Sequence, residues 1–308
     1  CTKQLVVEKT NDKGKKAKTV VRYIKGKNAT GQSLTENIIC KPTEKELIKV
    51  YKDNKVNTDK LVDCKNFTPK IKANEGLWDN IFIKPLAWLI LKLGYLVKNF
   101  GLAVILAGLA IRLILYPITN KSAMQSENLK KAQPELQRLE KKYANKMDDQ
   151  QAMMAKSQEM MAIYKKYNIS LFSGCLIAII QLPLFIAFLE AINRTPAIFE
   201  GKFLGLQLGT TPWFALSKGN FWYLIIPVIV FIVTFFSLKL NGTQATDNSN
   251  PAAGSTKMMM NMMVVVITIS SFQLSTAIGL YWITSSLFTV IQNLLVARSG
   301  NSAKIKKS

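Results

Sequence analysis

Long apolar runs separated by charged segments are the main pattern along the chain. A helix needs about 20 mostly apolar residues to cross the hydrocarbon core of a bilayer. Five stretches meet this requirement: Phe100–Pro117, Leu171–Ile192, Phe221–Leu240, Met258–Leu274 and Thr276–Ala297. Because the fourth is short and the fifth follows almost at once, we expect these two to form a tight hairpin. The pattern predicts an all-α membrane protein with five transmembrane helices.

Residues 76–98, directly before the first span, have an amphipathic pattern. Their tryptophans and lysines suit an interfacial helix that lies in the headgroup layer, and Pro85 is expected to break or begin that helix. Asp79, Lys84 and Lys92 interrupt the apolar run and argue against a crossing, although a sixth span stays open.

A polar segment, residues 120–168, separates the first two spans. Its helix formers predict two helices, roughly Ser122–Lys146 and Asp148–Tyr167, folded as a hairpin. Pro134 is expected to kink the first helix. Four methionines give the second helix an adaptable apolar ridge, which would pack on the first helix or contact lipid or another protein: Met153, Met154, Met160 and Met161.

Residues 1–75 are rich in lysine and contain no spanning run. Short β-like runs occur at Leu5–Val7 and Thr19–Ile24, and a capping box of Thr43 and Glu46 predicts the start of a helix. We expect a small exposed domain or a partly ordered tail, of uncertain fold.

The distribution of basic residues sets the expected orientation. Segment 120–168 and the tail 299–308 are basic, and short loops rich in Lys and Arg favour the cytoplasmic side of a membrane. Five spans then place residues 1–75 outside the cytoplasm, and place the hairpin and the C-terminus inside. Long domains cross a membrane largely regardless of charge, so the lysines of residues 1–75 do not oppose this topology of a bacterial cell membrane protein.

The net charge of +22 raises the question of nucleic-acid binding. The basic residues lie on the flanks of the apolar runs and form no RNA- or DNA-binding motif, which argues against it. The chain has no histidine, the commonest metal ligand and general base, and no phosphate-binding loop or nucleophile elbow. We therefore expect no enzyme activity, no metal and no cofactor.

Four cysteines are present: Cys1, Cys40, Cys64 and Cys175. Cys40 and Cys64 could form a disulfide outside the cytoplasm or remain free thiols. Cys175 lies in a span, where packing explains it. A chain that begins at Cys1 is expected to carry lipid there, as bacterial lipoproteins do, and an arbitrary start is the alternative.

Two charged residues are clear inside the predicted spans. Arg112 falls in the cytoplasmic half of the first span and Glu190 near the outer end of the second, so we do not expect them to pair. Charges in hydrocarbon are costly and usually functional. Two interpretations stay open for Arg112: its side chain reaches the inner surface, or a cavity with water holds it.

A polar stripe on the fifth span favours the cavity. Its members follow one another by three or four residues and share one helix face: Trp282, Ser285, Thr289 and Gln292. By depth, polar residues of the other segments fall near the midplane or in the inner half: Gln181, Ser237, Asn261 and Asn293. We infer a polar pocket open to the cytoplasm and closed outside by aromatic residues. A stripe that only joins helices by hydrogen bonds stays the alternative.

Five motifs now become recognisable: Ile83–Trp88, Ala110–Thr119, Gln158–Tyr164, Gly174–Pro183 and Gly279–Ser286. With the order of the spans and the hairpin, they resemble the YidC–Oxa–Alb family of membrane protein insertases, in particular its five-span bacterial members. The resemblance covers about residues 77–298 and implies that residues 99–298 are the insertase core.

The resemblance also implies roles for residues. The arginine of the family's groove falls on Arg112, its second-span glutamine on Gln181 and its outer aromatic residue on Trp282. A polar position of the third span falls on Ser237, where relatives often have glutamine. Three positions depart from the pattern of proline, proline and glycine: Ile177, Ser275 and Ala277.

The implied function is insertion of nascent membrane proteins into the lipid bilayer through a hydrophilic groove. The implied partners include the ribosome and the Sec translocon, and no small-molecule substrate. A small-solute or ion transporter and an assembly scaffold for membrane complexes are the alternatives. A transporter would show paired acids or inverted repeats, and the third to fifth spans contain no Asp or Glu.

Overall fold

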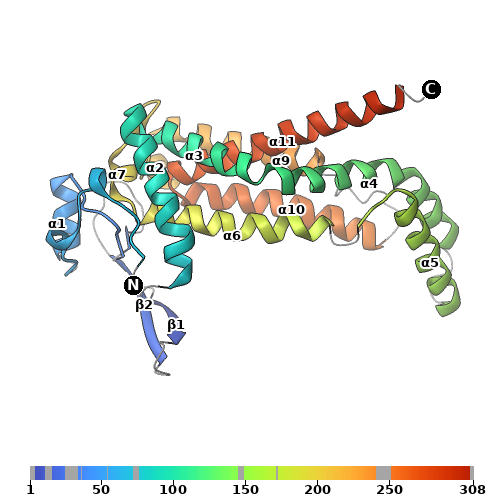
Figure 1. The fold of residues 1–308 in the computed structure, drawn as a ribbon, viewed down its shortest axis with the longest axis horizontal. Coiled ribbons are helices and arrows are strands. Elements are labelled where there is room, and N and C mark those ends of the chain that lie inside the picture. The colour runs from blue at the N-terminus through green and yellow to red at the C-terminus, as the bar shows by residue number, and fades with distance from the viewer. Residues whose placement is uncertain are drawn as a thin grey trace. The chain divides into compact units, whose positions relative to one another are not determined.

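The computed structural model describes residues 4–10, 16–24, 34–35, 37–53, 55–71, 76–144, 149–170, 173–240 and 251–305, without the side chains of 4–35, 46, 173–180, 251–260 and 300–305. These residues are mostly helical (Figure 1). The chain forms two compact units. The first comprises Cys1–Gly108, Leu184–Pro227 and Ser270–Trp282, and the second comprises Leu109–Pro183, Val228–Ile269 and Ile283–Ser308.

The N-terminal region contains a small antiparallel sheet in the order β1-β2-β3. Strand β1 (Gln4–Thr10) pairs along its length with β2 (Lys16–Ile24), and β2 also pairs with β3 (Leu34–Thr35). Both β-like runs of the sequence lie in these strands, whose β-branched residues favour extended backbone. The N-terminal region, whose fold the sequence left uncertain, therefore contains a small β-sheet at the two predicted β-like runs.

Residues 37–71, called the module below, contain a small core. Helix α1 (Lys45–Asp53) is followed by two 3₁₀ turns, Thr58–Lys60 and Cys64–Asn66. A disulfide joins Cys40 to Cys64 across 24 positions. Both sulfurs are buried with apolar side chains of the module: Ile38, Ile39, Leu47, Tyr51 and Phe67.

A continuous helical stretch follows, made of the π-helical turn η3 (Asp79–Ile83) and helix α2 (Lys84–Val97). Pro85 lacks an N–H group, and the π turn before it changes the hydrogen-bond register, so that Lys84 N–H donates to the carbonyl of Asp79. Helix α2 therefore has Pro85 in its first turn, as expected for a proline that begins a helix, and the π turn joins it to the preceding residues without a break. Helix α2 ends at Val97, and the left-handed φ of 54° at the following Lys98 permits the turn into helix α3 (Phe100–Ile114).

The segment between α6 and α9 contains only short elements. Helix α7 (Pro196–Glu200), the two-stranded sheet of β4 (Lys202–Phe203) and β5 (Leu206–Gln207), helix α8 (Pro212–Ser217) and the 3₁₀ turn η4 (Phe221–Leu224) follow in order. Their short helices begin with proline at the first turn, where its missing N–H costs nothing.

Helix α3 (Phe100–Ile114) and helix α4 (Tyr116–Tyr143) meet at a bend of 73°. Pro117 causes the break, because it cannot donate a hydrogen bond into the preceding turn. The first predicted span therefore ends at Ile114 rather than Pro117, and the first helix of the polar segment begins before Ser122. Pro134 lies inside α4.

Helix α5 (Gln150–Lys166) packs on α4. Leu139, Tyr143 and Ala152 are buried between them. Two matching charge clusters flank this contact. Glu159 accepts from Lys142 Nζ at 2.6 Å and from Tyr143, whereas Glu135 accepts from Lys166 Nζ at 2.6 Å and from Tyr167. Helix α5 begins after an Asp149 cap, whose side chain accepts from Gln151 N–H at 2.9 Å.

We expect the α4–α5 contact to weaken in acid. The donor groups of Lys166 and Tyr167 hold the pKa of the Glu135 carboxyl below its usual range, and Lys142 and Tyr143 do the same for Glu159. A carboxyl whose pKa is lowered by folding stabilises the fold above its ordinary pKa. That contribution is lost as the pH falls through the lowered pKa.

Spin labels at the exposed positions 141 and 158 would report this change as a broader distance distribution between about pH 7 and pH 3. Because both clusters are exposed, the effect should be small and weaker in high salt. The double variant Glu135→Gln, Glu159→Gln should respond less to pH, and an unaltered pH response in that variant would refute this origin.

Four further helices carry the remaining apolar runs: α6 (Ser173–Asn193), α9 (Ile225–Leu240), α10 (Pro251–Gln273) and α11 (Thr276–Ile305). Helix α10 begins before the predicted Met258, and α11 continues into the predicted basic tail. Only Leu274 and Ser275 separate these two helices, which agrees with the expected short connection.

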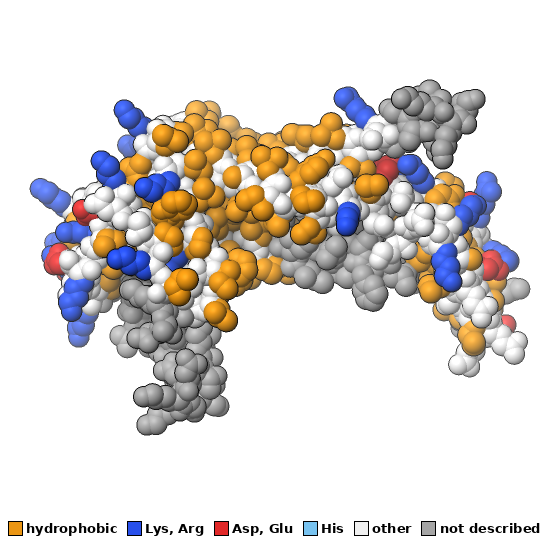
Figure 2. Space-filling model, viewed as in Figure 1, with side chains coloured by type: hydrophobic (Ala, Val, Ile, Leu, Met, Phe, Trp, Pro, Cys, Tyr) orange, Lys and Arg blue, Asp and Glu red, His pale blue; other side chains and the backbone are white. Residues whose placement is uncertain are grey.

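Length and composition identify three described helical stretches that could cross a membrane: Asp79–Val97, Phe221–Leu240 and Thr276–Ser299. The bent pair of α3 and α4 would add a fourth, and the described parts of α6 and α10 are shorter apolar helices. Figure 2 shows hydrophobic side chains over α3 and α11, whereas Lys and Arg gather over the module and the α4–α5 pair. The chain is thus largely helical, with several apolar helices.

Candidate functional site

Arg112 lies in the last turn of α3 and is only 7% exposed. Its Nη2 donates to Gln181 Oε1 of α6 at 2.5 Å and also to Ser285 Oγ of α11. Its Nε donates to Ser285 Oγ at 3.1 Å. The guanidinium is therefore held by two neighbouring helices. A snorkelling side chain would instead turn away from them toward a membrane surface.

The rest of the predicted polar stripe on α11 has other contacts. Gln292 is 4% exposed, and its Nε2 donates to Thr119 Oγ1 at 3.0 Å. The Thr289 hydroxyl donates to the Ser285 carbonyl of its own helix at 3.0 Å. Ser285 thus bonds directly to Arg112, while Gln292 links α11 to the beginning of α4.

Two other residues of the predicted pocket lie elsewhere in the second unit. Ser237 of α9 is buried, with Thr234 buried one turn before it. Asn261 of α10 is exposed. Its burial therefore does not support the prediction that it lines a pocket with Arg112.

Trp282 belongs to the first unit and lies in an aromatic cluster. It meets Phe185 of α6 edge to face at 4.9 Å, and Tyr281 stacks on Phe188 at 3.9 Å. Trp282 precedes Ser285 by three residues on α11, which is about one helical turn. The aromatic cluster therefore joins α6 and α11 within the first unit. Glu190, near the end of α6, lies 3.9 Å from Arg194.

Sequence reasoning missed polar residues at the beginning of α4. The Thr119 hydroxyl accepts from Gln292 and lies 3.2 Å from the Leu115 carbonyl at the bend. Asn120 Oδ1 and Ser122 Oγ are buried and have no hydrogen-bond partner within the described part of the chain. The sequence feature that could have identified them is the polar run that begins shortly after Pro117, most of which is part of the polar segment 120–168. The second unit thus contains buried polar groups, Asn120 and Ser122, that were not predicted to line the pocket.

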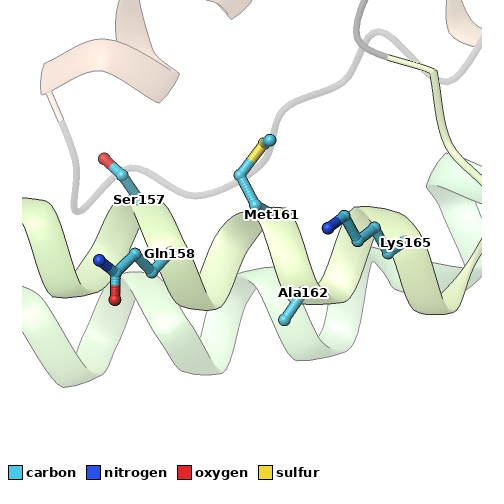
Figure 3. A pocket seen from close by; sticks show the side chains of 5 residues that line it. All are labelled: Ser157, Gln158, Met161, Ala162 and Lys165. Atoms are coloured by element: carbon cyan, nitrogen blue, oxygen red, sulfur yellow. The ribbon is translucent and has the colours of Figure 1, made fainter.

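A shallow pocket of about 450 Å³ lies on α5. Figure 3 shows Ser157, Met161 and Lys165 on one side of the helix, with Gln158 and Ala162 beside them. Met161 is 45% exposed, so part of the methionine ridge is open to a partner. Met160 instead packs against the contact with α4.

The cysteines complete the predicted set. Cys40 and Cys64 are disulfide-bonded, Cys175 lies in α6, and the proposed lipid attachment at Cys1 falls outside the described residues. The described residues contain no group of three or more Cys, Asp or Glu side chains that could hold a metal ion.

Comparisons with known proteins match most of this chain. The family model described as 60Kd inner membrane protein matches residues 92–304. The membrane protein insertase YidC of Oceanobacillus iheyensis is 33% identical over 243 residues, which are 78% of this chain and 91% of that protein. The membrane protein insertase MisCA of Bacillus subtilis is 32% identical and matches 77% of this chain and 85% of that protein.

A solved structure is also similar. The active YidC insertase crystal structure with the first transmembrane domain resolved has a TM-score of 0.50 and 26% sequence identity. The match covers 72% of this chain but only 47% of the crystallised chain. With the bacterial relatives and the apolar helices, these similarities establish a bacterial membrane protein. The chain belongs to the 60Kd inner membrane protein family, which includes the YidC insertases.

Proposed function

We propose that this chain inserts other proteins into the bacterial membrane, and that the buried polar cluster around Arg112 receives a short polar segment of each client. The observation that carries this proposal is the guanidinium of Arg112, buried between α6 and α11 on Gln181 and Ser285. Insertion by itself makes and breaks no covalent bond, so the chain is not an enzyme.

The physical argument concerns the cost of desolvation. Moving a polar group from water into an apolar environment without a partner costs roughly 2–7 kcal/mol. A charged donor and the buried acceptors Asn120 Oδ1 and Ser122 Oγ lower this cost for a client's polar segment. The client's apolar segment then enters lipid, at a gain of about 25 cal/mol per Å² of buried apolar surface. The positive charge favours acidic client segments.

The proposed topology has five spans, with the N-terminus outside and the α4–α5 pair as a cytoplasmic hairpin. Helix α2 is the interfacial helix in this arrangement. Two observations support this assignment. First, α2 runs crosswise to the adjoining helix α3 (Figure 1). Second, Leu77, Ile81 and Phe82 are exposed at the beginning of this stretch, where they can enter the headgroup boundary.

The proposed partners meet the cytoplasmic side. Clients would first touch the methionine ridge of α5, and the basic C-terminal end of α11 would attract ribosomal RNA electrostatically. The Sec translocon is a further proposed partner, and lipid at Cys1 would add an anchor to that of the helices.

Reconstitution of the purified protein with a small single-span client tests insertion. We expect the client to become protected from protease in liposomes that contain the protein and to remain accessible in empty liposomes. Flux of small solutes without a client, together with no client protection, would instead indicate a transporter.

Photo-crosslinkers at Gln181 and Trp282 locate the client during its synthesis. Leu182 is the matched control, because it is 61% exposed and points about 100° away from Gln181 on α6. We expect short-lived crosslinks to clients at 181 and 282 and fewer at 182. Crosslinks only to finished, assembled proteins would indicate a scaffold.

A further inference from the structure

The module of residues 37–71 is attached to the segment 194–210 through the carboxylate of Glu200. Glu200 Oε1 accepts from the backbone N–H groups of Thr43 at 2.7 Å and Glu44 at 2.9 Å, and Oε2 accepts from the Thr43 hydroxyl. These N–H groups lie at the beginning of α1, where a helix has spare donors and a partial positive charge. The carboxylate of a distant residue thus accepts from the Thr43 N–H, the donor that the expected capping box also involves.

Arg194 makes a second attachment. Its carbonyl accepts from Ile39 N–H at 2.9 Å, and its Nε donates to the Asn37 carbonyl at 2.8 Å. Its Nη1 lies 2.6 Å from Asp79 Oδ1 at the beginning of η3, in a pair that is mostly shielded from solvent. One arginine therefore joins the beginning of the module to the helical stretch that precedes the spans.

The other end of the module is fixed in the same way. Lys84 is only 7% exposed, and its Nζ donates to the Lys70 carbonyl at 2.8 Å and to Asn80 Oδ1 at 3.0 Å. The Cys40–Cys64 disulfide closes the module between these two attachments. The module is thus held at both ends and closed internally.

The segment that receives the module also caps α11. The Thr210 carbonyl accepts from Thr276 N–H at 3.0 Å, and the Leu208 carbonyl accepts from Ala277 N–H at 3.0 Å. These bonds satisfy spare donors of the first turn of α11, shortly before Tyr281 and Trp282. The module, the segment 194–210 and the beginning of α11 therefore form one chain of hydrogen bonds inside a single compact unit.

We propose that the module is a clamp that holds the segment 194–210 on the beginning of α11, with Glu200 and Arg194 as its positioning residues. The module precedes residues 92–304, the part that matches the family model. The clamp keeps the first turn of α11 capped, and through that turn it keeps the aromatic cluster of Tyr281 and Trp282 in place. It acts without contact to a client.

Hydrogen exchange of the full-length protein tests the clamp without relying on insertion activity. In Glu200→Ala, we expect amide exchange to become about tenfold faster in peptides covering 43–53, and a few-fold faster in peptides covering 276–282. Asp53→Ala is the matched control, because this exposed acid of the same module lies outside the contact. It should leave both peptides unchanged.

A second variant separates the clamp from a local cap. Cys40→Ser with Cys64→Ser should accelerate exchange in 276–282, because the open module no longer holds Asn37 and Ile39 on Arg194. Unchanged exchange in 276–282 in both variants would overturn the clamp, even if 43–53 became faster. Conversely, failure of client insertion in the unmodified protein, with these exchange changes intact, would refute the proposed function and leave the clamp standing.

Discussion

Replacement of Arg112 by alanine is expected to lower client insertion about ten- to a hundredfold. Hydrogen bonds of a charged group contribute about 1.5–3 kcal/mol each, and the variant removes both the charge and the donors that meet Gln181 and Ser285. A client's polar segment would then meet the buried acceptors Asn120 Oδ1 and Ser122 Oγ but no cationic partner. The rate of protease protection in proteoliposomes measures the loss.

Arg112→Lys distinguishes charge from shape. An ammonium keeps the positive charge but lacks the planar fork of the guanidinium, so we expect partial insertion. Lys239→Ala is the matched control, because it removes an exposed positive charge near the end of α9 and should leave insertion unchanged. Equal insertion by Arg112→Ala, Arg112→Lys and the unmodified protein would refute the role of the charge.

Apolar runs predicted a helix well where the length of the run alone determines that a helix forms. The runs at Phe221–Leu240 and Thr276–Ala297 lie in helical stretches, because about 20 apolar residues have few other stable states in a membrane. The end of α3 was predicted less well. Hydrophobicity continues from Ile114 to Pro117, but Pro117 interrupts the hydrogen bonds and begins a new helix. Local backbone chemistry, and not hydrophobicity, sets that boundary.

The central contact of the candidate site could be predicted because a charge within a span is costly and needs partners. Arg112 was found by its position, and Gln181 and Ser285 by depth and helical spacing. Thr119, Asn120 and Ser122 were missed, since they follow the proline that ends the first predicted span, and Asn120 and Ser122 were counted with the polar segment 120–168. The bend between α3 and α4 explains why polar residues outside the predicted spans are buried.

The clamp could not be predicted from local pattern. Glu200 and Thr43 are 157 positions apart, and the capping box with Glu46 was the nearest local explanation for a helix beginning there. A carboxylate supplied by another segment gives the same backbone donors an acceptor. Because the acceptor on the Thr43 N–H comes from a distant segment, it could not be predicted from the local sequence.

Gly279→Ala is expected to destabilise the protein by about 1–3 kcal/mol, the usual cost of overpacking a core. A Cβ atom at this position would lie 2.4 Å from Ile226 Cγ2, well inside contact distance. Ile226 is 3% exposed and therefore has little room to move. We expect the midpoint of thermal unfolding in detergent to fall, whereas Ser299→Ala at an exposed position of the same helix should leave it unchanged.

A double variant isolates the cause. Ile226→Ala alone should destabilise the protein by about 2–5 kcal/mol, because it leaves a cavity beside Gly279. In Gly279→Ala with Ile226→Ala, the new methyl group enters that cavity, so the combined loss should be smaller than the sum of the single losses. Additive losses would exclude the clash.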